Sequence, residues 1–257
     1  MVFNMGKDLN EKIDLAAKWI AESERHVVFT GAGVSTHSGL PDYRGPDGVW
    51  TRRDAGLPPP KSPPWDQVKP NIAHFSIVEL LKIGKLDYLI SQNVDGLHAK
   101  SGIPFEIMAE LHGNMYYLKC LECNKKMLFE EAGWDKNKWG KGYRTDGIKD
   151  SQPKCPHCEG RIINSIVNFG DPLPEDELYE SMRRSEASDV FFVIGSSLVV
   201  TPAANMPGIA KQSGSKLIIL NRGETPYDRV ADLRFFDDII DVLPPIIEKV
   251  KKLIATG

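Results

Sequence analysis

The sequence lacks the features that mark a nucleic-acid-binding or membrane-spanning chain. Its 257 residues carry 32 basic and 35 acidic side chains, a formal net charge of -3, so there is no basic excess for a phosphate backbone. No apolar run approaches the roughly 18 residues that a membrane-spanning helix needs. Residues 1–10 (MVFNMGKDLN) lack the basic region, apolar stretch and cleavage site of a signal peptide. We therefore expect neither nucleic-acid nor membrane partners and a cytoplasmic protein, or a nuclear one if the source is eukaryotic.

Cysteine is scarce, and all four cysteines stand in two C-x-x-C pairs, Cys120 with Cys123 and Cys155 with Cys158. Disulfides are rare in a reducing compartment, so the pairs indicate either a metal site, a redox dithiol or unrelated thiols. The paired spacing favours one tetrahedral Zn²⁺ held by four thiolates at about 2.3 Å. Such a closed shell has no position for water. We predict a structural zinc, with His157 a bystander inside the second pair.

Four short apolar runs do not alternate with polar residues, as expected of strands buried on both faces of a parallel sheet. Helical patterns separate them, and the alternation predicts an α/β fold with a Rossmann-like doubly wound parallel sheet. The predicted strands are 26–30, 86–90, 190–195 and 216–220, and the predicted helices are 10–24, 71–84, 175–187, 205–214 and a C-terminal pair broken at Pro244. We assign 1–114 and 164–257 to this domain and 115–163 to an inserted zinc-ribbon module, with part of 44–75 packing near it.

Polar or small residues follow each predicted strand: the Thr30–Gly33 turn, Ser91–Asn93, Gly195–Ser197 and Asn221. Ligands of open parallel sheets bind at the carboxyl ends of the strands. In the first turn, glycines 31 and 33 would let backbone N–H groups approach a phosphate. That turn lacks the third glycine of the dehydrogenase fingerprint and no acidic residue ends a clear second strand, so an ordinary dehydrogenase is disfavoured.

His112 is the strongest candidate for a general base. It lies in AELHGN (109–114), at the join between the two predicted parts of the chain. A neutral imidazole with a pKa of about 6.5 can take a proton near neutral pH, although a lone histidine is more often structural.

The motifs GAGVSTHSGLPDYRG, SQNVDGLH, ELHGN, the two C-x-x-C pairs, VNFGD, GSSL and NRGETP follow one another in an order that resembles the sirtuins. The resemblance covers about residues 25–240. It implies an NAD-dependent protein-lysine deacylase, with NAD in the large domain and an acyl-lysine peptide between the two parts. The acyl oxygen would attack the ribose carbon that bears nicotinamide, releasing nicotinamide and forming an alkylimidate. His112 would then deprotonate a ribose hydroxyl, and water would complete the reaction to lysine and O-acyl-ADP-ribose.

The resemblance also implies roles for individual residues. Asn93 and Asp95 would order the nicotinamide-ribose pocket beside His112. VNFGD and the residues after Leu198 would clamp the peptide by strand addition. The implied substrate contacts are Val167, Asn168, Phe169 and Gly170. The implied cofactor contacts are Gly31, Ala32, Gly33, Thr36, Tyr43, Arg44, Trp50, Gln92, Gly195, Ser196, Ser197, Asn221, Gly223 and Ile239.

The short stretch after Trp50 resembles the class four branch of the family. Three alternatives stay open: a mono-ADP-ribosyltransferase that uses the same NAD cleavage, a catalytically silent NAD-sensing module, and a plain zinc-ribbon scaffold. The scaffold leaves the polar strand ends unexplained. A monomer is favoured.

Overall fold

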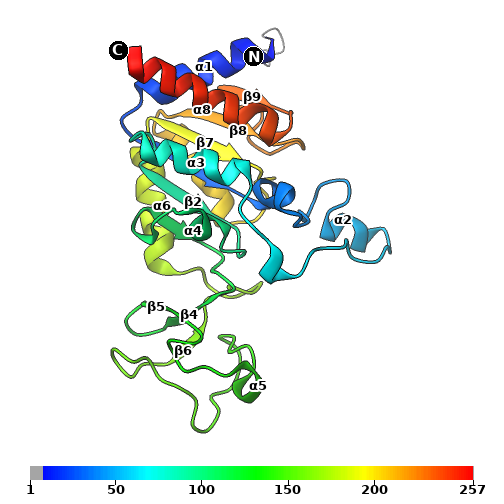
Figure 1. Ribbon diagram of the computed structural model, residues 1–257, viewed down its shortest axis with the longest axis vertical. Helices are drawn as coiled ribbons and strands as arrows, with labels where there is room; N and C mark the ends of the chain where they lie inside the picture. The colour runs from blue at the N-terminus through cyan, green and yellow to red at the C-terminus, as the bar shows by residue number, and fades with distance from the viewer. Residues whose placement is uncertain (1–7, 257) are drawn as a thin grey trace.

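A six-stranded parallel sheet forms the larger part of the molecule (Figure 1). The computed structural model describes residues 8–256, so residues 1–7 and 257 of the predicted first domain lie outside the described residues. The strand order is β3-β2-β1-β7-β8-β9, which confirms the predicted Rossmann-like sheet. The strands are β1 (His26–Thr30), β2 (Tyr88–Ser91), β3 (Met108–Glu110), β7 (Val190–Ile194), β8 (Lys216–Leu220) and β9 (Leu233–Phe235). All four predicted strands lie in the centre of the sheet, while β3 and β9 were not predicted.

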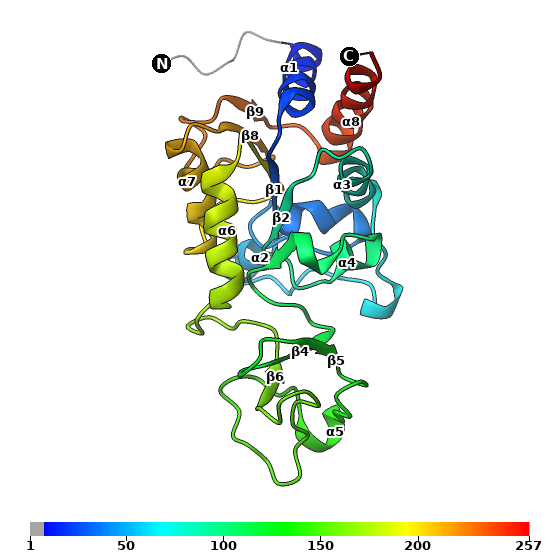
Figure 2. The ribbon, with the colours of Figure 1, turned by 90° about the vertical axis from the view of Figure 1, so that its left-hand side faces the viewer.

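Helices cover both faces of the sheet (Figure 2). We call the sheet with these helices the sheet domain. One face is covered by α1 (Leu9–Glu22), α3 (Ile72–Lys82) and α8 (Ile239–Thr256), and the other by α6 (Glu175–Ala187) and α7 (Met206–Gln212). Shorter elements are α2 (Val49–Asp54), α4 (Leu97–Ser101), η1 (Ala32–Ser38), η2 (Trp65–Gln67), η3 (Phe105–Ile107) and η4 (Ala203–Asn205). Among the described residues, no helix combines the length and apolar character needed to cross a membrane.

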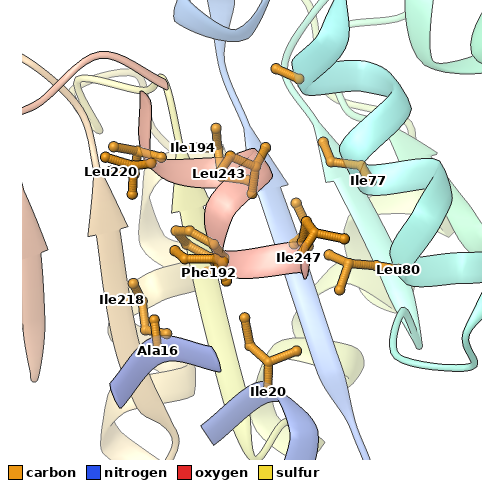
Figure 3. Close-up of a cluster of buried hydrophobic side chains, with 14 of the residues drawn as sticks. Ala16, Ile20, Ile77, Leu80, Phe192, Ile194, Ile218, Leu220, Leu243 and Ile247 are labelled. Atoms are coloured by element: carbon orange, nitrogen blue, oxygen red, sulfur yellow. The ribbon is translucent and has the colours of Figure 1, made fainter. Parts of the chain in front are cut away.

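The strands of the sheet send alternate side chains to its two faces. Phe192 and Ile218 enter the cluster under α1, α3 and α8, where Ile20 and Ile247 meet them (Figure 3). Phe191, one residue before Phe192, enters the cluster on the opposite face. Burial on both faces explains why these strands read as continuous apolar runs.

The inserted part of the chain forms a second, smaller sheet, which we call the zinc module (residues 115–164). Its antiparallel strands are β4 (Tyr117–Cys120), β5 (Lys126–Leu128) and β6 (Ile162–Asn164), in the order β5-β4-β6, and α5 (Lys136–Trp139) lies in the long connection. Asn164, one residue beyond the predicted end of the module, pairs with Leu118 in this sheet, so we include it in the module; the domain bounds stay a prediction. Figure 1 shows the module extending from one end of the sheet domain.

The predicted break at Pro244 is wrong, because α8 runs without interruption from Ile239 to Thr256. Pro244 and Pro245 have no backbone N–H, so each leaves one helical hydrogen bond unmade. The carbonyls that would have accepted these bonds lie in the first turn of the helix. Beyond them, Ile246, Ile247 and Val250 are buried against the sheet domain. Packing of this apolar face maintains the helix.

The segments that the resemblance assigns to peptide clamping are not strands in this structure, so strand addition by them stays a prediction. Residues 167–171 close a turn in which Asp171 N–H donates to the Asn168 carbonyl over 3.0 Å and the Asn168 amides approach the Asp171 carboxylate. Residues 198–202 are also irregular. Among residues 8–256, neither segment pairs with a strand, and a strand needs such a partner to exchange its backbone hydrogen bonds.

Candidate functional site

The turns that follow β1 and β7 pack directly against each other. Gly33 N–H donates to the Gly195 carbonyl over 2.9 Å, and Gly31 N–H donates to the Ile194 carbonyl over 3.1 Å. A Cβ atom at Gly31 would lie 2.7 Å from the Gly195 oxygen, and one at Gly33 would lie 2.7 Å from the Gly195 Cα. Gly195 itself has a φ of +66°, which favours glycine. These glycines are therefore required first for the contact between two turns; contact with a phosphate stays a prediction.

Gln92 connects three strand ends. It directly follows β2, and its Nε2 donates to Ser196 Oγ, after β7, over 2.7 Å. Its backbone N–H donates to the Thr30 carbonyl, at the end of β1, over 3.0 Å. Its own carbonyl accepts a hydrogen bond from His112 Nδ1 over 2.9 Å. Gln92 thus joins the predicted cofactor edge to the predicted base.

The bond to Gln92 fixes the tautomer of His112. A carbonyl oxygen only accepts hydrogen bonds, so Nδ1 carries the proton and Nε2 keeps a free lone pair. Burial lowers the pKa of His112, and the bond to the Gln92 carbonyl opposes that effect only in part. The imidazole is therefore neutral at pH 7 and is suited to accept a proton at Nε2.

Asn93 and Asp95 belong to a buried polar network with Ser35. Ser35 Oγ donates to Asp95 Oδ2 over 2.7 Å, and Asp95 Oδ1 accepts from Leu97 N–H over 2.9 Å. Asn93 Nδ2 donates to the Gly31 carbonyl over 3.2 Å and lies 3.4 Å from Ser35 Oγ. The network holds the loop after β2 against the turn after β1. Ser35 was not singled out in the sequence, although it lies inside the GAGVSTHSG motif.

The predicted cofactor residues beyond β7 lie further along the same edge. Asn221 follows β8, and its Nδ2 donates to the Gly223 carbonyl over 2.9 Å. The buried Arg234 donates to the carbonyls of Asn221 and Gly223, over 2.6 and 2.5 Å, and thereby holds this loop. Ile239 is buried at the start of α8. Three further predicted residues are partly or fully exposed in the turns after β1 and β7: Ala32, Thr36 and Ser197.

Three aromatic side chains form a second group beside the strand ends. The rings of Tyr43 and Trp50 stack with centroids 5.7 Å apart, and Phe169 meets Trp50 edge-on at 6.3 Å. Arg53 lies over the Trp50 ring, 4.5 Å from its centroid. Phe169 is 82% exposed, so most of its side chain faces solvent beside Trp50 of α2. Arg44 is also exposed, and its predicted phosphate or carboxylate contact stays a prediction.

The predicted substrate segment is bonded to the turn that carries the base. Val167 N–H donates to the His112 carbonyl over 3.0 Å. Asn168 and Gly170 belong to the turn that presents Phe169, and Gly170 has a φ of +90°. The structure thus brings Val167 next to His112, whereas Phe169 points to the aromatic group.

The four cysteines converge on one point. Their sulfur atoms all lie within 4.8 Å of one another, with 3.5 Å between Cys120 and Cys158 and 3.7 Å between Cys123 and Cys155. Sulfurs at the corners of a tetrahedron about 2.3 Å from a central Zn²⁺ lie about 3.8 Å apart. All four thiols are free of disulfides. The donor set therefore fits one structural zinc.

Both cysteine pairs use the same backbone geometry. In the first, Cys120 N–H donates to the Lys125 carbonyl and Asn124 N–H returns to the Cys120 carbonyl. In the second, Cys155 N–H donates to the Gly160 carbonyl and Glu159 N–H returns to the Cys155 carbonyl. The residue after each pair has a positive φ, 58° at Asn124 and 60° at Glu159. Matched knuckles of this kind aim two sulfurs each at a common centre.

The fold and the site together define a dinucleotide-binding α/β protein with a structural zinc module. The Sir2 family pattern matches residues 59–202. The chain is 39% identical to NAD-dependent protein deacetylase 1 of Pyrobaculum aerophilum, over 95% of this chain and 97% of that protein. The chain belongs to the Sir2 family, the sirtuins.

Two further comparisons agree with this placement. An NAD-dependent protein deacetylase of Oryza sativa subsp. indica is 39% identical over 90% of this chain, and the chain spans about half the length of that relative. A solved structure of Sir2 with a p53 peptide and NAD⁺ superposes with a TM-score of 0.70 at 34% identity, covering 96% of this chain and 100% of that one.

Proposed function

We propose that this chain removes acyl groups from lysine side chains of proteins, with NAD as the co-substrate. The observation that carries the proposal is the hydrogen bond from His112 Nδ1 to the Gln92 carbonyl, because it orients a neutral imidazole at the strand-end edge. The buried network of Ser35, Asn93 and Asp95 lies beside it. An NAD-dependent deacylase of the Sir2 family needs both a dinucleotide edge and a base at that edge, and in this proposal the strand-end turns and His112 supply them.

The residues of the chain have distinct tasks in this reaction. NAD supplies the ribose carbon that is attacked, the nicotinamide that leaves and the hydroxyl that receives the acyl group. His112 Nε2 accepts the proton of that hydroxyl after nicotinamide has left. Asn93 and Asp95 orient the ribose through polar contacts, and the turns at Gly31 and Gly195 hold the rest of the dinucleotide. The products are free lysine, nicotinamide and O-acyl-ADP-ribose.

The zinc has no reacting position in this scheme. Four thiolates complete a tetrahedral shell, so Zn²⁺ stabilises the module and does not bind water or substrate. An acyl-lysine peptide would lie between the module and the sheet domain, along Val167, Asn168, Phe169 and Gly170.

The test uses purified protein, NAD and a panel of acetyl-, succinyl- and long-chain-acyl-lysine peptides, with products identified by mass spectrometry. Formation of O-acyl-ADP-ribose in equal amount to free lysine and nicotinamide is expected for at least one peptide. Transfer of labelled ADP-ribose to protein in the absence of acyl-peptide would instead support the mono-ADP-ribosyltransferase alternative. No nicotinamide release with any peptide would refute both and would leave the NAD-sensing alternative.

We further propose the class four-like placement, a cytoplasmic location and a monomer. Between Trp50 and the start of α3 the chain has only the remainder of α2 and the three-residue η2, in keeping with a short cofactor-binding segment. Four free thiols at one metal site suit a reducing compartment. A single chain supplies the base, the strand-end turns and the metal ligands, so none of these sites requires a second copy.

A further inference from the structure

Five charged side chains meet where the zinc module joins the sheet domain. Lys126 Nζ lies 2.9 Å from Glu110 Oε2 and 3.1 Å from Glu177 Oε1. Lys119 Nζ lies 3.0 Å from Asp176 Oδ1 and 3.7 Å from Glu177 Oε1. The lysines belong to β4 and β5 of the module, and the carboxylates belong to β3 and α6 of the sheet domain. Every ion pair in this cluster therefore crosses the junction, near the end of α6 that faces the module (Figure 2).

All members of the cluster except Asp176, whose side chain is 48% exposed, are largely shielded from water. The exposed fraction of the side chain is 3% for Glu110, 17% for Lys126 and 13% for Glu177. Removal of ionised groups from water is costly, and buried ion pairs are consequently a poor source of net stability. What a buried ion pair does impose is a fixed geometry, because each charged group must stay next to its partner. The groups that hydrogen-bond to Glu110 should therefore have fixed positions too.

Glu110 holds the turn that carries His112. Its second carboxylate oxygen, Oε1, accepts from Asn114 Nδ2 over 2.6 Å, and its backbone carbonyl accepts from Gly113 N–H over 2.8 Å. Its backbone N–H donates to Glu177 Oε2 over 2.5 Å. Glu110 thus accepts two hydrogen bonds from the residues that follow His112. Its side chain binds Asn114, and its backbone carbonyl binds Gly113.

The turn has little freedom to adjust. Gly113 has a φ of +79°, and a Cβ atom there would lie 1.9 Å from the Ser165 carbonyl oxygen. Asn114 N–H donates to Ser165 Oγ over 3.0 Å, and that hydroxyl donates back to the Asn114 carbonyl over 2.7 Å. A shift of Asn114 would therefore move the backbone on the C-terminal side of His112.

We propose that Glu110 and Lys126 form a positioning pair for His112, in which an ammonium of the zinc module holds the carboxylate that holds the base-carrying turn. Neither residue touches the reacting atoms. The pair gives the remote zinc a physical connection to the base: the metal orders the module, the module places Lys126, and Lys126 fixes Glu110. This inference rests on the proposed deacylase function.

The test compares two steps of the reaction in the full-length, zinc-loaded protein. Acyl-peptide-dependent exchange of labelled nicotinamide into NAD reports the step before His112 acts, and formation of free lysine reports the steps after it. In Lys126→Met, which keeps the apolar stem and removes the charge, kcat for lysine formation is expected to fall by about 10-fold or more. Nicotinamide exchange and the KM values for NAD and peptide are expected to stay within about 3-fold of wild type.

Matched variants separate the pair from general effects of charge. Lys126→Arg restores a cation at the same place and is expected to recover most of the lysine formation. Lys149→Met removes an exposed lysine of the module outside both cysteine pairs and is expected to change neither step. Glu110→Gln removes the charge from the other partner and is expected to slow lysine formation selectively as well. The double variant Glu110→Gln, Lys126→Met should be no slower than Lys126→Met, because Lys126→Met already breaks the pair that Glu110→Gln would break.

Zinc content, measured by mass spectrometry, and circular dichroism accompany each assay. The proposal is overturned if Lys126→Met forms lysine at the wild-type rate, or if both steps slow equally while zinc stays bound. Should Lys126→Met lose zinc or unfold, Glu110→Gln decides: a folded Glu110→Gln protein with full lysine formation overturns the proposal. A wild-type protein that releases no nicotinamide would refute the deacylase function itself, before any variant is compared.

Discussion

The two parts of this molecule are held together in different ways. The sheet domain has two large clusters of buried side chains, one on each face of the sheet. The zinc module has one small cluster, and two of its members, Cys120 and Cys155, are also metal ligands. Trp134 and Met127 are among the few large apolar side chains that it buries. A segment of this size buries too little apolar surface to fold reliably without help.

The two parts should therefore be destabilised by different changes. Apolar burial stabilises the sheet domain, and metal binding stabilises the module, because its sulfur ligands converge only in the folded state. The parts remain coupled through the ion pairs at their junction, of which Lys126 with Glu110 is the most buried. Changes aimed at one part can therefore be used to separate the contributions.

The largest expected effect is loss of the metal from the module. Cys155→Ser removes one of four thiolates, and binding of structural zinc contributes on the order of 10 kcal/mol to small zinc domains. We expect zinc loss and rapid hydrogen exchange across residues 115–164, together with lost deacylation, while β1 and β7 stay protected. His157→Ala, inside the same knuckle, is the control and should keep zinc. Retained zinc and protection in Cys155→Ser would show that the module is stable without the complete shell.

The next effect is aimed at the core of the sheet domain. Phe192→Ala removes a side chain that is completely buried in the cluster beneath α1 and α8. The expected cost is about 3–5 kcal/mol of unfolding free energy, measured by urea denaturation, with zinc content unchanged. Phe75→Ala, at a half-exposed position on α3, should cost far less. Equal effects of the two changes would contradict the buried role of Phe192.

Acid should weaken the sheet domain through three buried histidines. Burial lowers the pKa of His26 to about 4, of His74 to about 3 and of His98 to about 4. Each folded pKa lies below the unfolded value of 6.5, so the unfolded chain takes up protons first as the pH falls. Stability is therefore complete above about pH 6.5 and is lost toward pH 4, by about 2 kcal/mol per histidine at pH 5.

The slope of unfolding free energy against pH measures this effect. Between pH 6.5 and 5, His74→Gln should have a flatter slope than wild type, because one buried titrating group is gone. Gln212→Ala, at an exposed position on α7, removes no titrating group and should leave the slope unchanged. An unchanged slope in His74→Gln would mean that its imidazole titrates alike in both states.

The smallest expected effect concerns the connection between strand ends. Gln92→Ala removes the bond to Ser196 Oγ but keeps the backbone carbonyl that holds His112. We expect this bond to hold the strand ends in the arrangement that binds NAD. Its loss should therefore cost about 1 kcal/mol of binding free energy, so that NAD binds roughly 5-fold more weakly while kcat changes little. Calorimetric titration with NAD measures the affinity, and Gln212→Ala, at an exposed position on α7, is the control. Unchanged NAD affinity would count against a cofactor edge at Gln92.

Local signals in the sequence were sufficient for the centre of the fold. The central strands were predicted because each is apolar along its whole length, as at 190–194. The short edge strands β3 and β9 were missed, since three residues carry little pattern. Pro244 misled the prediction because the sequence does not show how firmly the later turns of α8 pack.

Part of the candidate site could likewise be predicted from the sequence, and part could not. The clustering of the four cysteines could be predicted from their spacing. His112 was selected as the candidate base from its motif, and that role stays a prediction. Its hydrogen bond to the Gln92 carbonyl spans 20 positions, and the contact between Lys119 and Asp176 spans 57. Such pairings depend on the sheet order and on how the module joins it, which no local pattern contains. Ser35, Glu110 and Lys126 were missed for this reason.

The most direct test of the account compares wild type with His112→Ala, using labelled NAD and an acyl-lysine peptide. If the imidazole held by Gln92 is the base, lysine formation should fall by at least ~10²-fold, while nicotinamide exchange continues and the circular dichroism spectrum is unchanged. Lysine formation near the wild-type rate in a folded His112→Ala protein would contradict the account.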